Sequence, residues 1–206
     1  MISRESIVFE QIVDDLAEKG FSVTDSFLDD SEIEAILSVD EFKNKMLHFK
    51  KAGIGNSASL KINENVRGDH ISWVDTRKAH ISISVYVSRL KVLQVYLNKT
   101  LFLSLKDIEL HLTSYPVGSY YRRHVDQFKQ QDHRKISVIL YLNRDWRSEQ
   151  GGQLRVYSQS NEIDIFPVAG RLVCMRSDLI EHEVLPASRE RLSVTGWMLD
   201  QLIDIK

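Results

Sequence analysis

The sequence predicts an α+β domain with a core of short strands and packing helices, mainly N-terminal. Helix patterns are confined to the first 106 residues, whereas strand-like runs separated by turn residues begin at Asp107. Six to eight short strands backed by helices suggest a barrel or jelly roll whose mouth is available for a site. A chain of 206 residues can bury a sizeable core, and it shows neither repeats nor a linker, so we expect one domain over residues 1–206.

Three elements are expected at the N-terminal end. Residues 5–19 carry apolar side chains at helical spacing and precede Gly20, which can take the left-handed conformation that ends a helix. Residues 21–28 are predicted to form a strand. The pattern Ser31-x-x-Glu34 is typical of a capping box and predicts that a second helix begins there.

The middle of the chain is expected to contain a long loop and a long helix. Residues 53–72 are rich in Gly and Asn and lack a sustained period, which predicts a loop with room for a β-ribbon. Apolar residues at helical spacing predict a helix over about 80–103, which needs a sheet or other helices to pack against. The C-terminal runs that are predicted to form strands are 108–116, 136–142, 152–157, 171–176, 182–186 and 191–199.

Composition and charge exclude several classes of protein. The single cysteine, Cys174, rules out an intramolecular disulfide framework, and we expect it to be buried in a strand. No apolar run suits a membrane span or a signal peptide, so we expect a cytoplasmic protein with no membrane partner. Residues 51–106 hold nine basic against three acidic side chains, but without clustering or interleaved aromatic residues. This pattern favours a solvated face over a nucleic-acid site.

A candidate metal site begins with His124-Val125-Asp126. In an extended segment, side chains two positions apart point to the same side, so the imidazole and the carboxylate would converge; a surface ion pair or a cap is the alternative. His182 lies in a predicted strand of the same region, and two histidines with one carboxylate form a facial triad. This ligand set suits non-haem Fe(II), because it leaves positions open for a cosubstrate and dioxygen, although zinc can use the same ligands.

Arg191 begins the last predicted strand, where alternation defines two faces. One face would carry Arg191, Ser193, Thr195 and Trp197, and the other Leu192, Val194 and Met198. The polar face either meets water or lines the interior, where Arg191 would offer two parallel donors to a ligand carboxylate, and periodicity leaves both interpretations open. The histidines without a partner at ligand spacing, which we interpret as surface or packing residues, are His70, His80, His111 and His133.

Taken together, the triad and Arg191 resemble the signature of the 2-oxoglutarate-dependent dioxygenases. The flanking sequence is similar to the prolyl 4-hydroxylase branch, which includes the hypoxia-inducible-factor prolyl hydroxylases and their bacterial relatives. The similar stretches are VRGDHISW (66–73), YPVGSYYRRHVD (115–126), ILYLNRDW (139–146), GGQLRVY (151–157) and HEVLPASRERLSVTGW (182–197). The resemblance implies a double-stranded β-helix (jelly-roll) catalytic core over 107–200, with residues 1–106 supplying helical support and a mobile substrate loop.

This resemblance also assigns roles to individual residues. It makes His124, Asp126 and His182 the iron ligands, and it makes Arg191 the partner of the distal carboxylate of 2-oxoglutarate. Tyr141 matches a tyrosine that hydrogen-bonds the same carboxylate.

Further residues match positions around the cosubstrate and the substrate. Thr195 matches a residue near the metal that interacts with the cosubstrate, and Tyr115 and Tyr121 match tyrosines that line the pocket. Arg134 and Trp197 match residues that contact a substrate peptide around its target proline.

A mobile loop over residues 63–75 is implied as well. Arg67, Asp69 and Trp73 match the part of this loop that folds over bound substrate, and Asp69 is expected to pair with Arg134.

The function that the resemblance implies is Fe(II)- and 2-oxoglutarate-dependent hydroxylation at C4 of a prolyl residue in a protein. Dioxygen is the oxidant, 2-oxoglutarate the cosubstrate and ascorbate a candidate reductant. Bacterial relatives are associated with elongation factor Tu, so a translation factor is the expected partner, and we favour a monomer. The alternatives are the same chemistry on a free amino acid, another side chain or a small molecule, and a binding or sensor module that turns over poorly.

Overall fold

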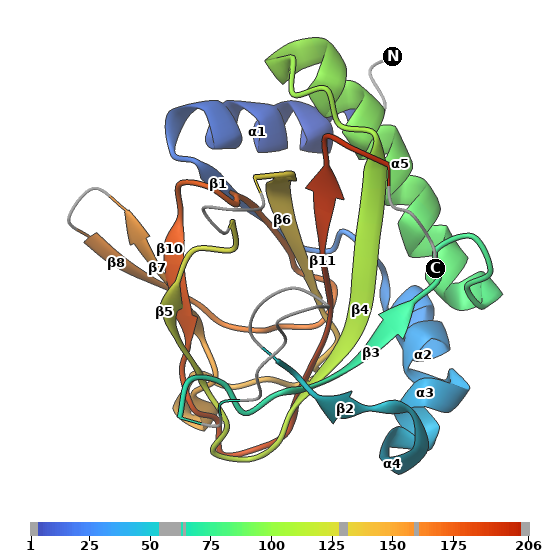
Figure 1. The fold of residues 1–206 in the computed structure, drawn as a ribbon, viewed down its shortest axis with the longest axis vertical. Coiled ribbons are helices and arrows are strands. Elements are labelled where there is room, and N and C mark those ends of the chain that lie inside the picture. Colours follow the sequence, from blue (N-terminus) through green and yellow to red (C-terminus); the bar gives the residue numbers. More distant parts are fainter. Residues whose placement is uncertain (1–3, 54–62, 64, 128–131, 159–160, 203–206) are drawn as a thin grey trace.

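The computed structural model describes residues 4–53, 63, 65–127, 132–158 and 161–202 (Figure 1). The helices are α1 (Arg4–Glu18), α2 (Asp30–Leu37), α3 (Asp40–Lys43), α4 (Lys45–His48), α5 (Ile81–Leu101) and the 3-10 helix η1 (Ser148–Gln150). The strands are β1 (Phe21–Thr24), β2 (Lys50–Lys51), β3 (His70–Val74), β4 (Asp107–Tyr115), β5 (Tyr121–His124), β6 (Arg134–Tyr141), β7 (Leu154–Ser158), β8 (Asn161–Ile165), β9 (Leu172–Arg176), β10 (Glu181–Val184) and β11 (Arg191–Leu199).

Two antiparallel sheets form the core. The major sheet has seven strands in the order β1-β9-β6-β11-β4-β3-β2, and the minor sheet has four in the order β5-β10-β7-β8. Strands β4 to β11 contribute four neighbours to each sheet, which is the arrangement of a double-stranded β-helix, or jelly roll. The predicted fold class is therefore confirmed.

Alternation along the central strands separates two apolar cores. On β6, Val138 and Leu140 face the helices together with Cys174 of β9. Cys174 is therefore buried in a strand, as predicted. The intervening Ile139 and Tyr141 pack with the minor sheet instead. Helices α1 and α5 lie along the outer face of the major sheet (Figure 1) and fill the first core with their apolar sides. The inner face of the major sheet, which is turned toward the minor sheet, is therefore not covered by these helices and can line a site.

The second helix begins two residues earlier than predicted. Asp29, not Ser31, is its N-cap: the Asp29 carboxylate accepts from the Glu32 backbone N–H, and the Glu32 carboxylate accepts from the Asp29 N–H, both at 2.9 Å. The predicted box at Ser31 and Glu34 is wrong, since Ser31 donates its hydroxyl to Asp29. The register with Asp29 as cap is favoured because apolar Leu28 then lies just before the cap and packs in the same core as Ile33.

Residues before Asp107 contribute strands as well as the predicted helices. The first strand ends at Thr24, earlier than the predicted 21–28, and β2 and β3 form an antiparallel ribbon at the edge of the major sheet. Within the implied mobile loop over residues 63–75, His70–Val74 form β3 and pair along β4, and the mobility of the loop stays a prediction. Residues 54–62 and 64 of the predicted loop lie outside the described residues. The backbone groups of His70–Val74 find their hydrogen-bond partners on β4, and the local sequence of this segment does not predict that pairing.

Strands β5 and β8 have no separate prediction. Their sequences, YRRH and NEIDI, are polar and mostly exposed, so alternation gives no apolar signal. Within the described residues, no helix is both long and apolar enough to span a membrane.

Candidate active site

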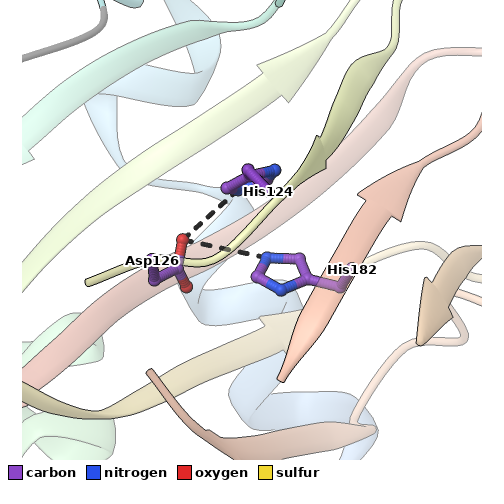
Figure 2. Close-up of side chains that lie close together, drawn as sticks. All are labelled: His124, Asp126 and His182. Carbon is purple, nitrogen blue, oxygen red and sulfur yellow. Dashed lines mark ion pairs between the residues drawn. The ribbon is translucent and has the colours of Figure 1, made fainter. Parts of the chain in front are cut away.

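The two histidines of the predicted triad lie opposite each other on neighbouring strands. His124 on β5 and His182 on β10 are Cα partners in the antiparallel ladder, and Asp126 follows β5 by two residues. Asp126 Oδ1 lies 3.4 Å from Nε2 of His124 and 3.8 Å from Nε2 of His182 (Figure 2). One candidate ligand atom from each residue lies within 4.8 Å of the others, so the three can hold a single metal ion.

Backbone carbonyls fix the protonation of both rings. Nδ1 of His124 lies 2.7 Å from the Arg122 carbonyl, and Nδ1 of His182 lies 3.0 Å from the Ile180 carbonyl. A carbonyl oxygen only accepts, so each Nδ1 carries a proton and Nε2 is the ring nitrogen that faces Asp126 and is left to bind a metal. The Tyr121 ring stacks on His124 with centroids 3.6 Å apart and holds that imidazole in plane.

The charges of the triad also suit a divalent cation. Burial favours the neutral form of Asp126, but His182, His124 and the Ser137 hydroxyl outweigh it and hold the pKa of this carboxyl well below its ordinary value. Burial lowers the pKa of His182, with Asp126 offsetting part of the effect. Among the described residues this is the only group of three metal-ligating side chains of this kind. An ionised carboxylate between imidazole nitrogens matches the donors that first-row divalent metals prefer.

A cavity of about 600 Å³ opens above the triad. All the predicted site residues except Tyr141 line it. They are Arg67, Asp69, Trp73, Tyr115, Tyr121, His124, Asp126, Arg134, His182, Arg191, Thr195 and Trp197. The fold therefore gathers residues from β3, β4, β5, β6, β10 and β11 around one space.

Arg191 is the buried cation of this cavity. Its side chain faces the interior, so of the two interpretations left open by the sequence the polar face lines the interior and does not meet water. It donates from Nε to the Gly152 carbonyl at 3.0 Å and from Nη2 to the Tyr141 hydroxyl at 3.2 Å. In the described part of the chain no carboxylate pairs with Arg191, so its remaining donors are available to an anionic ligand.

The rest of the wall is aromatic. The guanidinium of Arg134 stacks 3.5 Å from the centroid of the Trp197 ring, and His111 lies between Trp197 and Trp73 with centroid distances of 5.5 and 5.1 Å. Trp73 is 56% exposed, whereas Trp197 is buried. The three rings are inclined to one another, with interplanar angles of 78° for Trp73 and His111 and 52° for His111 and Trp197, and such an aromatic surface suits an apolar ring or a peptide segment.

The expected ion pair between Asp69 and Arg134 does not form. Asp69 instead receives two hydrogen bonds from Arg67, at 2.7 Å from Nε and 2.6 Å from Nη2. Arg134 donates to Glu109 at 2.8 Å. The sheet register explains why Arg134 pairs with Glu109 and not with Asp69. Glu109 lies directly opposite Trp197, and Arg134 stacks on Trp197.

His111 is a buried packing residue, in agreement with its interpretation as a surface or packing histidine, and it also lines the cavity wall. It is buried, its Nδ1 lies 2.9 Å from the Thr113 hydroxyl, and burial lowers its pKa to about 4. Alternation along β4 could have predicted this position in the cavity wall, since His111 and Thr113 share a face with Tyr115. No local pattern could have placed His48, Lys50 and Lys51 at the outer wall, because their position depends on the β2–β3 pairing.

Comparisons with known proteins agree with this geometry. Residues 110–199 match the family model of the 2OG-Fe(II) oxygenase superfamily. The chain is 29% identical to mouse prolyl hydroxylase EGLN3 over 95% of its own length and 85% of that protein. It is 30% identical to the hypoxia-inducible factor prolyl hydroxylase of Caenorhabditis elegans, of which it covers 29%.

Solved structures extend the similarity to the whole fold. A crystal structure of a Pseudomonas putida prolyl-4-hydroxylase is 37% identical, with a TM-score of 0.84, over 94% of this chain and 100% of that one. A Trichoplax adhaerens prolyl hydroxylase, in complex with a hypoxia-inducible factor peptide fragment, is 26% identical with a TM-score of 0.85, over 96% of this chain and 91% of that one. The chain therefore belongs to the 2-oxoglutarate- and Fe(II)-dependent oxygenases. Within that superfamily it is a member of the prolyl hydroxylase branch.

Proposed function

We propose that this enzyme hydroxylates C4 of a prolyl residue in a protein substrate. The observation that carries the proposal is a single cavity that joins a His-Asp-His triad, a buried arginine without a carboxylate partner and an aromatic wall. The relatives support it, since those compared above are named prolyl hydroxylases and one of them holds a peptide.

In this proposal His124, Asp126 and His182 hold Fe(II). Two neutral imidazoles and one ionised carboxylate fit that ion and leave positions open for other ligands. The bound iron centre supplies the oxidising chemistry by which one oxygen atom enters a C–H bond while 2-oxoglutarate is converted to succinate and carbon dioxide. The two histidines need no reorientation to bind metal, because the Arg122 and Ile180 carbonyls already fix their tautomers.

Arg191 binds the distal carboxylate of 2-oxoglutarate. Its guanidinium offers a planar pair of donors, and the tyrosine rings of Tyr115 and Tyr141 flank it at 5.0 and 4.8 Å. The Tyr141 hydroxyl accepts a hydrogen bond from Arg191, so its own proton is available for the same carboxylate. Thr195 and Tyr121 line the space between this end and the triad and contact the cosubstrate there.

The aromatic wall receives the substrate. A prolyl ring is apolar and flat enough to pack on Trp197, whose orientation the stacked Arg134 fixes. Trp73 and the Arg67–Asp69 pair lie at the edge of this surface and exclude water from the reacting C–H bond once a peptide covers them.

The test uses purified enzyme, Fe(II), 2-oxoglutarate, air and two substrates analysed by mass spectrometry. One is intact elongation factor Tu, the translation factor that we propose as first candidate, and the other is a peptide pool from a whole proteome. One added oxygen atom on a prolyl residue, with matching succinate, supports the proposal. Succinate without any oxidised peptide would instead favour a small molecule or a free amino acid as substrate.

A further inference from the structure

Two buried serines stand behind the carboxylate of the triad. Ser137 lies on β6, and Ser177 directly follows β9, the neighbouring strand of the major sheet. Each is only 1% exposed. Asp126 comes from the segment that leaves the minor sheet, so these serines bridge the two sheets at the site.

The hydrogen bonds between these groups have one consistent direction. Ser137 Oγ lies 2.6 Å from Asp126 Oδ2 and 2.8 Å from Ser177 Oγ. An ionised carboxylate has only acceptors, so the single hydroxyl proton of Ser137 goes to Asp126. Ser177 must then donate its own proton to Ser137. Both hydroxyl dipoles therefore point at the carboxylate, and each strengthens the other.

The contact with Ser137 gives the two carboxylate oxygens of Asp126 different roles. Oδ2 is occupied by Ser137, whereas Oδ1 faces the Nε2 atoms of both histidines (Figure 2). Ser177 also anchors the backbone beyond the carboxylate, because its carbonyl accepts from the Gln127 N–H at 2.9 Å. Rotation of the Asp126 side chain would break the first contact, and the second limits movement of its backbone.

We propose that Ser137 and Ser177 are positioning residues that fix the orientation of Asp126 and thereby set the affinity of the site for its metal. The proposal rests on the metal site of the proposed function. Neither serine touches the metal or the substrate in this scheme. Ser177 acts on the carboxylate of Asp126 only through Ser137, so the two serines form a relay that runs from Ser177 to Ser137 to Asp126.

The experiment measures binding of Co(II) alone, followed by its visible absorption, to the full-length metal-free protein. Ser137→Ala is expected to weaken Co(II) binding about 10- to 100-fold, because Asp126 loses the contact that fixes its orientation, and to change the absorption bands, because Oδ2 loses its donor and can then reach the metal. Ser137→Thr keeps the hydroxyl and is expected to stay close to wild type. Ser177→Ala is expected to have a smaller effect, which disappears when Ser137 is already alanine.

Ser22→Ala is the matched control. Ser22 is equally buried and also donates to a carboxylate, Asp15 at 3.0 Å, but on β1, away from the cavity. Its removal should leave Co(II) affinity unchanged, and thermal unfolding of each metal-free variant reports whether it is folded. Ser137→Ala with wild-type affinity and absorption would overturn the relay while the metal site stands. Wild-type protein that fails to bind Co(II) would overturn the proposed function itself, and the relay with it.

Discussion

Arg191 donates from Nη2 to the Tyr141 hydroxyl at 3.2 Å, and neither side chain is more than 2% exposed. No carboxylate among the described residues pairs with Arg191, and a guanidinium at such depth is costly to bury unless a ligand supplies the anion. Because β6 and β11 are neighbouring strands, the fold itself holds Tyr141 beside Arg191, the residue that is proposed to bind the cosubstrate.

Replacing Arg191 should therefore act on cosubstrate affinity. Loss of one member of a buried charge pair costs roughly 3–5 kcal/mol, so Arg191→Ala should weaken 2-oxoglutarate binding by about 100- to 5000-fold. Arg191→Lys should not rescue it, because an ammonium lacks the two parallel donors. Calorimetric titration of 2-oxoglutarate into the Mn(II)-loaded protein measures both, with exposed Arg144→Ala as control. Near-normal affinity of Arg191→Ala would refute the role.

Metal binding should stabilise the folded chain. A metal that binds only the folded state at about 100 times its dissociation constant adds about 2.7 kcal/mol to the free energy of unfolding. We expect Mn(II) to raise the melting temperature of the wild type and to leave that of His182→Ala unchanged. His133→Ala, which removes a histidine paired with Asp200 outside the cavity, should keep the metal-dependent increase. An equal increase in His182→Ala would place the metal elsewhere.

Folding stability should fall as the pH drops from about 6.5 to 4. Burial lowers the pKa of His111 to about 4, against about 6.5 in an unfolded chain. The unfolded state thus binds a proton first, so His111 contributes stability above pH 6.5 that is lost by about pH 4, on the order of 3 kcal/mol. Urea unfolding across this range should show a shallower loss for His111→Gln. Identical slopes for the wild type and His111→Gln would mean that folding does not lower the pKa of His111.

Gly152 should tolerate no side chain. Its φ is +71°, and an added Cβ would lie 2.9 Å from both Trp146 and Ala187. Gly152→Ala should lower the free energy of unfolding by about 1–3 kcal/mol. It should also weaken 2-oxoglutarate binding, since the Gly152 carbonyl holds Arg191. Gly118→Ala is the comparison, with a similar φ of +76° but open space around it, so backbone strain alone should leave the ligand affinity intact.

Double-mutant cycles should couple Asp69 to Arg67 and not to Arg134. The Asp69 side chain is fully buried, and Arg67 gives it two hydrogen bonds. We expect a coupling energy of about 1–3 kcal/mol for that pair in urea unfolding, and a value near zero for Asp69 with Arg134. A strong coupling to Arg134 would restore the pairing that the sequence predicted.

Much of the fold could be predicted because apolar alternation is strong where strands are buried. Val138 and Leu140 alternate with Ile139 and Tyr141, and the structure uses both faces. Polar strands such as β8 carry no such signal, and β3 becomes a strand through pairing with β4. Local patterns therefore located the core and the edge strand β1, but missed the other edge strands β2, β5 and β8.

The candidate site divides in the same way. His124 and Asp126 could be predicted as neighbours because they are two positions apart in the sequence. The partner of Asp69 could not, because choosing between Arg67 and Arg134 requires the register that brings Glu109 to Arg134. His111 was interpreted as a surface or packing residue and is a packing residue, but its place in the cavity wall was not predicted, because alternation puts it on the same face of β4 as Tyr115 without showing that this face lines a cavity.

The most direct test of the central claim counts two products in one reaction. Wild-type enzyme with Fe(II), 2-oxoglutarate, air and a prolyl peptide that it oxidises should form one succinate for each prolyl residue that gains an oxygen atom at C4. His182→Ala, refolded and checked by circular dichroism, should form neither product. Prolyl oxidation that persists in His182→Ala, or succinate formed without any oxidised prolyl residue across the peptide pool, would contradict the account.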